Sequence, residues 1–226
     1  MEIFLINLVV ACVGGYDMEY ANKSVSMFRR NVDLDVSAYC ITDRPELLDA
    51  TITPIEPKPV VSGWWNKTIA FSPDMPQGWT VVIDLDVVII GNITKIIEYA
   101  IENTLQMATY NDALHWHGCK MSSSFMIFKS GSLAHIYEKF CSDWPGIQDF
   151  PGGDQVWLYP QLDNVLFLDE IFPDFKKSFK VDIMQIKDGK IEVPNKLDSN
   201  VRLIDFHGYP KPHQIKHWPL VANNWC

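Results

Sequence analysis

Two aspartates interrupt the most apolar segment of the chain. Asp84 and Asp86 stand in the run TVVIDLDVVII, residues 80–90. In an extended strand this spacing puts both side chains on one face, where two carboxylates repel each other and lose hydration. Mg²⁺ or Mn²⁺ would relieve both costs and could bridge the pair to a diphosphate. The pattern therefore predicts a metal site, although aspartates that end a strand, cap a helix or face solvent would fit it as well.

Two further polar segments contain residues suited to the same chemistry. His207 and Lys211 occur in DFHGYPKPH, residues 205–213. A neutral imidazole is a good Mn²⁺ ligand, and an ammonium group stabilises negative charge on a departing phosphate. The alternatives are a structural histidine at a strand end and a solvated loop lysine. Asp154 and Gln155 follow two glycines in GGDQVWL, where Asp154 could instead cap a helix.

These segments, in this order, resemble the GT-A-fold glycosyltransferases of family 8. VVIDLDVVIIGNI resembles their D-x-D strand, and Trp65-Asn66-Lys67 resembles the aromatic-x-K element before it. GGDQVWL is similar to the family's D-Q segment, and SSSFMIF to its small-residue strand on the acceptor side. DFHGYPKPH resembles the H-x-x-G-x-x-K-P-W signature, with Gly208 directly after His207 and His213 in place of tryptophan.

The resemblance implies an α/β GT-A fold, with a central mixed, mostly parallel sheet flanked by helices and one domain over residues 1–226. It implies a metal-dependent transferase that moves a hexose from a UDP-sugar, with UDP-glucose or UDP-galactose favoured and with retention of configuration. Slow hydrolysis of the donor is expected without an acceptor. The acceptor itself is open: a glycan, a lipid-linked molecule or a protein.

The resemblance also assigns roles to individual residues. Asp84, Asp86 and His207 would hold Mn²⁺ or Mg²⁺, Lys211 would contact the diphosphate, Asp154 the hydroxyls of the donor sugar, and Gln155 would lie under the anomeric carbon. The catalytic set is Asp154, Gln155 and Lys211. The donor and metal set is Ala11, Val13, Tyr16, Thr42, Asp43, Arg44, Lys67, Asp84, Leu85, Asp86, Ser123, Ser124, His207, Gly208 and Lys211.

Some of these roles have simpler alternatives. Tyr16 would stack on uracil and Asp43 would accept a base N–H, but the glycines at 14 and 15 could form a plain turn and Asp43 could pair only with Arg44. Lys67 would reach the ribose or phosphate, although a helical surface lysine fits the sequence nearly as well.

The elements that must position these residues alternate between strands and helices. Strands are expected over residues 1–13, 34–41, 80–90, 105–110, 124–128, 165–168 and 201–206, with helices over 18–30, 64–71, 135–140 and from 153. This alternation indicates an α/β sheet, in which ligands bind beyond the carboxyl ends of strands.

A second aromatic and polar cluster is HWHG, residues 115–118. His115 and His117 would share a face of an extended segment, which makes a zinc site conceivable, but only two ligands are visible. An acceptor-side loop with Trp116 as a sugar platform is preferred. The tail from Lys211 to Cys226 could fold over the donor, or Trp218 could pack in the core.

Composition limits the class of protein. A chain of 226 residues with 47% hydrophobic content suits one globular domain, and a net charge of -9 argues against nucleic-acid binding. No leader or membrane span is expected, and five cysteines without paired spacing favour a reducing compartment. The expectation is a cytoplasmic enzyme, in the host cytoplasm if viral, with the sequons at Asn22, Asn66 and Asn92 accidental.

Three other functions compete with the glycosyltransferase hypothesis. IDLDVVI resembles the nucleophile motif of haloacid-dehalogenase-like phosphatases, which also need a later lysine and an acidic metal-binding pair; no such pair follows Lys129 in register. A non-catalytic nucleotide-sugar-binding module would be expected to have lost the aspartates or His207. A nucleotidyltransferase would need a glycine-rich, basic phosphate loop, which the first residues lack.

Overall fold

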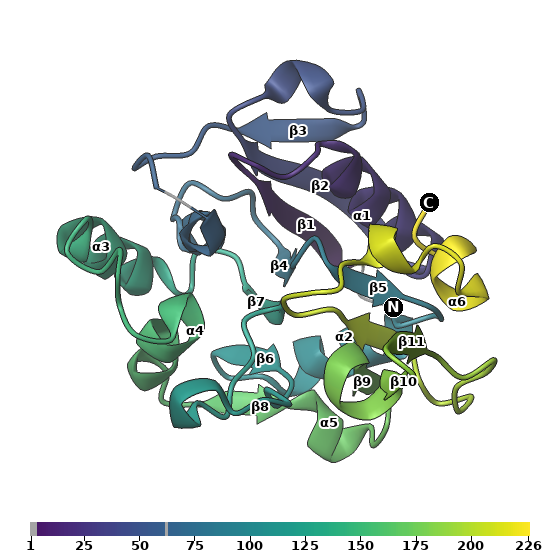
Figure 1. Cartoon of the computed structure of the whole chain (residues 1–226). Coiled ribbons are helices and arrows are strands. Elements are labelled where there is room, and N and C mark those ends of the chain that lie inside the picture. Colours follow the sequence, from purple (N-terminus) through teal and green to yellow (C-terminus); the bar gives the residue numbers. More distant parts are fainter. Residues whose placement is uncertain (1–3, 62) are drawn as a thin grey trace.

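A computed structural model describes residues 4–61 and 63–226 and is built around a seven-stranded sheet (Figure 1). The strand order is β3-β2-β1-β4-β7-β6-β8. The strands are β1 (Leu5–Cys12), β2 (Asp35–Thr42), β3 (Ile52–Ile55), β4 (Trp79–Ile83), β6 (Met107–Thr109), β7 (Phe125–Lys129) and β8 (Val165–Phe167). Only β7 runs antiparallel to its neighbours. The predicted mixed, mostly parallel sheet is confirmed.

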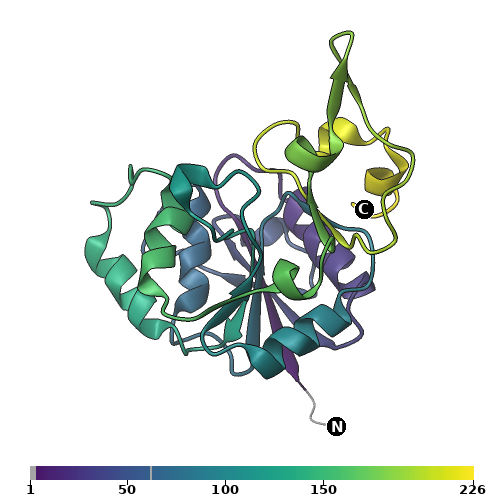
Figure 2. The same ribbon diagram turned by 90° about the horizontal axis from the view of Figure 1, so that it is seen from below.

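Both faces of the sheet are buried, as the apolar strands predict. Alternate residues of β1 serve two cores: Ile6, Leu8 and Val10 pack on one side and Val9 on the other. Helices α1 (Glu19–Arg30) and α2 (Thr94–Asn103) cover the first face. The second is covered by the 3₁₀ segment η2 (Gly63–Phe71) with α3 (Ala134–Asp143) and α4 (Gly153–Leu158) (Figure 2). The expected helices are all present.

The expected single strand over residues 80–90 is wrong. β4 ends at Ile83, residues 84–86 turn, and the amide of Val87 donates to the carbonyl of Asp84 at 3.2 Å. The chain then enters β5 (Val87–Ile89), which belongs to a second sheet with β12 (Leu203–Asp205) and β9 (Lys176–Ser178). Valine and isoleucine are buried equally well in either sheet, so an apolar run does not reveal where the chain changes sheets.

The C-terminal segment, residues 184–226, packs beside α1. Its first part is a small hairpin of β10 (Gln185–Lys187) and β11 (Lys190–Glu192) that projects from the molecule (Figure 2). Trp218 is buried in this segment and donates its indole N–H to the carbonyl of Pro194 at 2.8 Å, so it packs in the core. The remaining elements are η1 (Pro45–Leu47), η3 (Trp116–Gly118), η4 (Tyr159–Gln161), α5 (Leu168–Ile171), η5 (Phe179–Ile183), η6 (Pro212–Ile215) and α6 (Pro219–Ala222).

Three further observations bear on the sequence-based expectations. Among the described residues, no helix has both the length and the apolar character required to cross a bilayer. The five cysteines, Cys12, Cys40, Cys119, Cys141 and Cys226, are free thiols. Asn66 is fully buried and donates to the carbonyl of Gly63 at 2.8 Å, so its sequon is inaccessible in the folded chain.

Candidate active site

The segments expected to bind the nucleobase meet beyond the carboxyl ends of β1 and β2. Asp43 accepts a hydrogen bond from the amide of Gly14 at 3.3 Å, and Arg44 donates to the carbonyl of Tyr16 at 2.8 Å. Asp43 and Arg44 also form an ion pair at 3.3 Å. Residues Ala11 and Val13 of one segment and Thr42 of the other flank these contacts, since Ala11 and Cys12 pair in register with Ile41 and Thr42.

A buried lysine joins the first aspartate of the D-x-D turn to the D-Q segment. Lys67, on η2, lies with its Nζ 2.7 Å from Asp84 Oδ1 and 3.3 Å from Asp154 Oδ2, and it donates to Ser123 Oγ at 3.1 Å. Burial alone would lower the pKa of Lys67, but the Asp154 and Asp84 carboxylates outweigh it and raise that pKa. The surface-lysine alternative is therefore wrong.

The second aspartate pairs with the lysine of the C-terminal motif. Lys211 Nζ makes an ion pair with Asp86 Oδ2 and lies 5.6 Å from the centroid of the Tyr16 ring. Burial raises the pKa of Asp86 to about 6, with Lys211 opposing the shift and Asp84 adding to it. Leu85, between the two aspartates, is buried, so the turn is anchored by its apolar residue.

His207 lies next to the D-x-D turn because β12 pairs with β5. The amide of Phe206 donates to the carbonyl of Asp86 at 3.1 Å. The His207 ring hydrogen-bonds through Nε2 to Ser178 Oγ at 2.9 Å, and its Nδ1 lies 3.9 Å from Asp205 Oδ1. Burial lowers the pKa of His207, which favours the neutral imidazole that a metal requires.

Two buried acids of this region were missed by the sequence analysis. Asp205 accepts from the Tyr110 hydroxyl at 3.0 Å, while its Oδ1 is buried without a hydrogen-bond partner. Burial raises the pKa of Asp205 to about 6. Asp112 accepts from Gln155 Nε2 at 3.0 Å. Two features of the sequence could have indicated these acids. Asp205 stands two residues before His207, which in an extended chain places both side chains on one face. Asp112 comes just after a predicted strand, where α/β folds bind ligands.

The residues expected at the metal fit a divalent cation in donor type and in charge. Asp84, Asp86 and His207 offer carboxylate and imidazole donors, and the orphaned oxygen of Asp205 leaves buried negative charge beside them. The two D-x-D carboxylates already form ion pairs with lysines, Asp84 with Lys67 and Asp86 with Lys211. Within residues 4–61 and 63–226, no three acidic, histidine or cysteine side chains are already arranged to hold an ion. Metal binding would therefore require Lys211 to leave Asp86.

Several other expectations can be compared with the geometry. His115 and His117 have φ angles of 45° and 52°, so the chain turns at both and they do not share a face of an extended segment. The side chain of Trp116 lies outside the described part of the chain. Asp154 lies in the first turn of α4, where Gly152 is the N-cap residue without a side-chain capping bond, so the capping alternative for Asp154 is wrong. The backbone carbonyl of Ser124 accepts a hydrogen bond from the amide of Asp84 at 2.9 Å.

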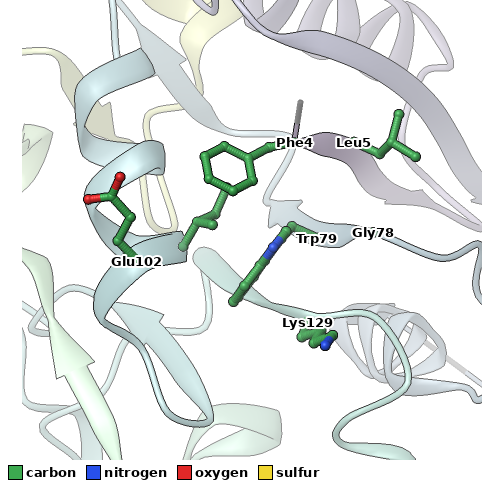
Figure 3. Close-up of a pocket in the computed structure, with 7 residues that line it drawn as sticks. Phe4, Leu5, Gly78, Trp79, Glu102 and Lys129 are labelled. Carbon is green, nitrogen blue, oxygen red and sulfur yellow. The ribbon is translucent and has the colours of Figure 1, made fainter. Parts of the chain in front are cut away.

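A surface hollow of about 430 Å³ lies at the amino ends of β1 and β4, opposite the strand ends that carry the candidate site (Figure 3). Phe4, Leu5, Gly78, Trp79 and Lys129 line it together with two residues of α2. Leu5 and Trp79 begin β1 and β4, whereas the predicted site residues follow the ends of those strands. The hollow is separate from the candidate active site.

Solved glycosyltransferases share this architecture over nearly the whole chain. A variant of LgtC with an altered active-site residue superposes with a TM-score of 0.65 at 11% identity, covering 96% of this chain and 95% of that one. The chain has the GT-A fold. The galactosyltransferase LgtC in complex with donor and acceptor sugar analogs gives 0.59 at 10% identity, covering 96% of both chains.

A third similar structure is the glycosyltransferase GlyE of Streptococcus pneumoniae TIGR4. It superposes with a TM-score of 0.64 at 12% identity, over 97% of this chain and 61% of GlyE. No family model and no curated protein sequence matches the chain. At these identities the likeness establishes the fold, and activity must be argued from the site.

Proposed function

We propose that this chain is a metal-dependent, family-8-like glycosyltransferase that transfers a hexose from UDP-glucose or UDP-galactose to an acceptor, with retention of configuration. The observation that carries the proposal is the convergence of the D-x-D turn, the D-Q segment and the His207 motif through two lysine–carboxylate pairs. These segments are far apart in the sequence, and they meet at the strand ends where α/β folds bind ligands.

In this proposal Asp84, Asp86 and His207 hold Mn²⁺ or Mg²⁺, which when bound supplies positive charge to the donor diphosphate. Tyr16 stacks on uracil, and Asp43 accepts a base N–H while it holds the turn at Gly14. Lys211 lies between Asp86 and Tyr16, so it is positioned to move from the carboxylate to the diphosphate and to stabilise the charge that develops there.

The D-Q segment serves the donor sugar. Lys67 holds Asp154 beside Asp84, which orients the Asp154 carboxylate toward sugar hydroxyls near the metal. Asp112 accepts a hydrogen bond from Nε2 of Gln155. The amide oxygen of Gln155 is then available to face an electron-poor anomeric carbon. An amide is a weak nucleophile, which favours attack by the acceptor on the face of the departing diphosphate over a covalent intermediate.

The GT-A fold weakens the phosphatase alternative, because the D-x-D turn is explained together with the D-Q and His207 segments. We further propose that residues 1–226 form one domain and that the enzyme works in the cytoplasm, which the free cysteines support. The acceptor remains a choice among a glycan, a lipid-linked molecule and a protein.

The test is release of UDP from UDP-glucose and UDP-galactose with and without Mn²⁺. We expect Mn²⁺ to stimulate slow release of UDP without an acceptor, and Asp86→Ala to remove the stimulation while the circular dichroism spectrum stays native. Failure to bind or cleave either donor with metal present would refute the donor assignment. Full activity of Asp86→Ala would refute the metal role of Asp86.

A further inference from the structure

Tyr20, on α1, lies between the C-terminal segment and the candidate active site. It is buried, and its hydroxyl hydrogen-bonds to Nδ1 of His213 in η6. Its ring packs edge to face against the rings of Tyr16, at 5.5 Å between centroids, and of Trp225, at 4.7 Å. One side chain of α1 therefore contacts the residue proposed to stack on uracil and two parts of the C-terminal segment.

His213 belongs to a closed turn that begins at Lys211. The amide of Lys211 donates to Oε1 of Gln214 at 2.8 Å, and the amide of Gln214 donates to the carbonyl of Lys211 at 2.9 Å. Pro212 fixes one backbone angle within the turn. Because two hydrogen bonds and a proline make the turn rigid, a contact that holds His213 also constrains the backbone of Lys211.

The Lys211 side chain reaches from this turn into the candidate site. Its Nζ pairs with Asp86 and lies 5.6 Å from the centroid of the Tyr16 ring. A lysine side chain is long and flexible, so its contacts are only as well defined as the backbone that carries it. Tyr20 contacts both the turn that carries Lys211 and the aromatic ring beside its ammonium group.

Other contacts hold the C-terminal segment farther from the site. Arg30 donates to the carbonyls of Asn224 at 2.7 Å and Cys226 at 2.9 Å, which ties the last residues of the chain to α1. Trp218 is buried in the same core as α1. We therefore expect the segment to stay folded when the Tyr20 hydroxyl is removed, and only the turn at Lys211 to loosen.

The contact depends on a histidine at the position where the family signature has tryptophan. A neutral imidazole offers one ring nitrogen as a hydrogen-bond acceptor, whereas an indole N–H can only donate. Burial raises the pKa of Tyr20 to about 12, so its hydroxyl keeps its proton at neutral pH and can donate it. Tyr20 and His213 are thus matched as donor and acceptor.

We propose that Tyr20 positions Lys211 by holding His213, which fixes the η6 turn against α1. This inference rests on the proposed role of Lys211 at the donor diphosphate. When the turn is held, the ammonium group is already close to the place where the charge of the leaving group develops, and little ordering remains for the transition state. Loss of the Tyr20 hydroxyl therefore slows the chemical step more than it weakens donor binding.

The kinetic test measures Mn²⁺-dependent release of UDP from the UDP-hexose that the wild type cleaves. We expect Tyr20→Phe to lower kcat about fivefold and to leave KM within about twofold, because it removes one hydrogen bond and keeps the ring. His213→Ala should lower kcat at least as much, and His213→Gln, whose amide oxygen can accept the bond, should keep most of it. Tyr137→Phe is the matched control: it removes a hydroxyl on α3 that donates to the carbonyl of Lys58 at 2.7 Å, and it should keep the wild-type kcat.

The double variant Tyr20→Phe/His213→Ala shows whether the two residues act through one contact. If they do, the double variant is no slower than His213→Ala. Losses of kcat that multiply, or a wild-type kcat in Tyr20→Phe, would overturn the proposal. So would a higher KM with an unchanged kcat, because Tyr20 would then act on donor binding alone.

The rate at which acetic anhydride acetylates Lys211, followed by mass spectrometry, tests the positioning without catalysis. The Lys211 side chain is 15% exposed and ion-paired, whereas that of Lys139 is 54% exposed and serves as the internal reference. We expect Tyr20→Phe to raise the Lys211 rate relative to Lys139 by about fivefold, and Tyr137→Phe to leave it unchanged. If the wild type cleaves no donor, the proposed function fails and this rate alone decides: an increase in Tyr20→Phe supports the positioning of Lys211, and an unchanged rate overturns it.

Discussion

Lys67 is the residue on which the charge balance of the candidate site depends. Its ammonium group lies between the carboxylates of Asp84 and Asp154, and the lysine is 4% exposed. A buried charge cluster of this kind adds little net stability against an apolar substitute, but removing one partner leaves the others uncompensated. Lys67 therefore keeps two acids close together.

The substitution Lys67→Met should destabilise the folded protein by about 3 kcal/mol, because it leaves the buried carboxylate of Asp154 and the half-buried one of Asp84 without their counter-charge. Urea denaturation measures this change. Lys139→Met is the matched control, since Lys139 forms an exposed pair with Asp143 at 2.7 Å and should have little effect. Added Mn²⁺ should restore part of the loss in Lys67→Met. Equal stability of the two variants would show that Lys67 does not balance these acids.

At the scale of elements, the pairing of β5 with β12 brings the ends of the predicted site together. It connects the D-x-D turn to the segment of His207, Gly208 and Lys211. The loop after β12 depends on Gly208, which has a φ of 73° and whose Cβ would lie 2.6 Å from Lys180 Nζ. The conformation of one glycine thus helps to set where His207 and Lys211 lie.

We expect Gly208→Ala to lower stability by about 1 kcal/mol through backbone strain and to weaken Mn²⁺-dependent binding of UDP as well. Gly131→Ala provides a close comparison: Gly131 has a φ of 78°, and a Cβ there would meet no atom within 4 Å. It should lose similar stability and keep UDP binding, measured by calorimetry. UDP binding that is equal in both variants would refute a role for the Gly208 loop in the site.

The elements also show how far sequence reasoning reached. The strand and helix at residues 5–30 follow from strict patterns, since β1 alternates between two cores and Ala21, Val25 and Phe28 line one face of α1. The break at residues 84–86 and the roles of Asp112 and Asp205 were not predicted. The break depends on which sheet each strand joins, and the two aspartate roles depend on contacts between segments distant in the sequence. Hydrophobic periodicity holds information on neither.

At the scale of the whole molecule, the candidate site draws its residues from both sheets, which also share one hydrophobic core. Asp84 and Lys67 belong to the central sheet and to the helices of its second face, whereas His207 and Lys211 belong to the smaller sheet and the C-terminal segment. A nucleotide diphosphate and a metal bound together would link both parts. Ligands that bind only the folded state raise its apparent stability by an amount that grows with the logarithm of ligand concentration over Kd.

This geometry predicts a thermal shift that requires both ligands. UDP with Mn²⁺ should raise the melting temperature by more than the sum of the separate shifts, because in the proposed site Asp84, Asp86 and His207 would hold an ion that supplies positive charge to the diphosphate, while Lys211 would change partner. Asp86→Ala should lose the excess, and UMP should give a smaller one because it lacks the second phosphate. Shifts that are simply additive in the wild type would mean that metal and diphosphate do not share a site, and the proposed donor chemistry would then lose its physical basis.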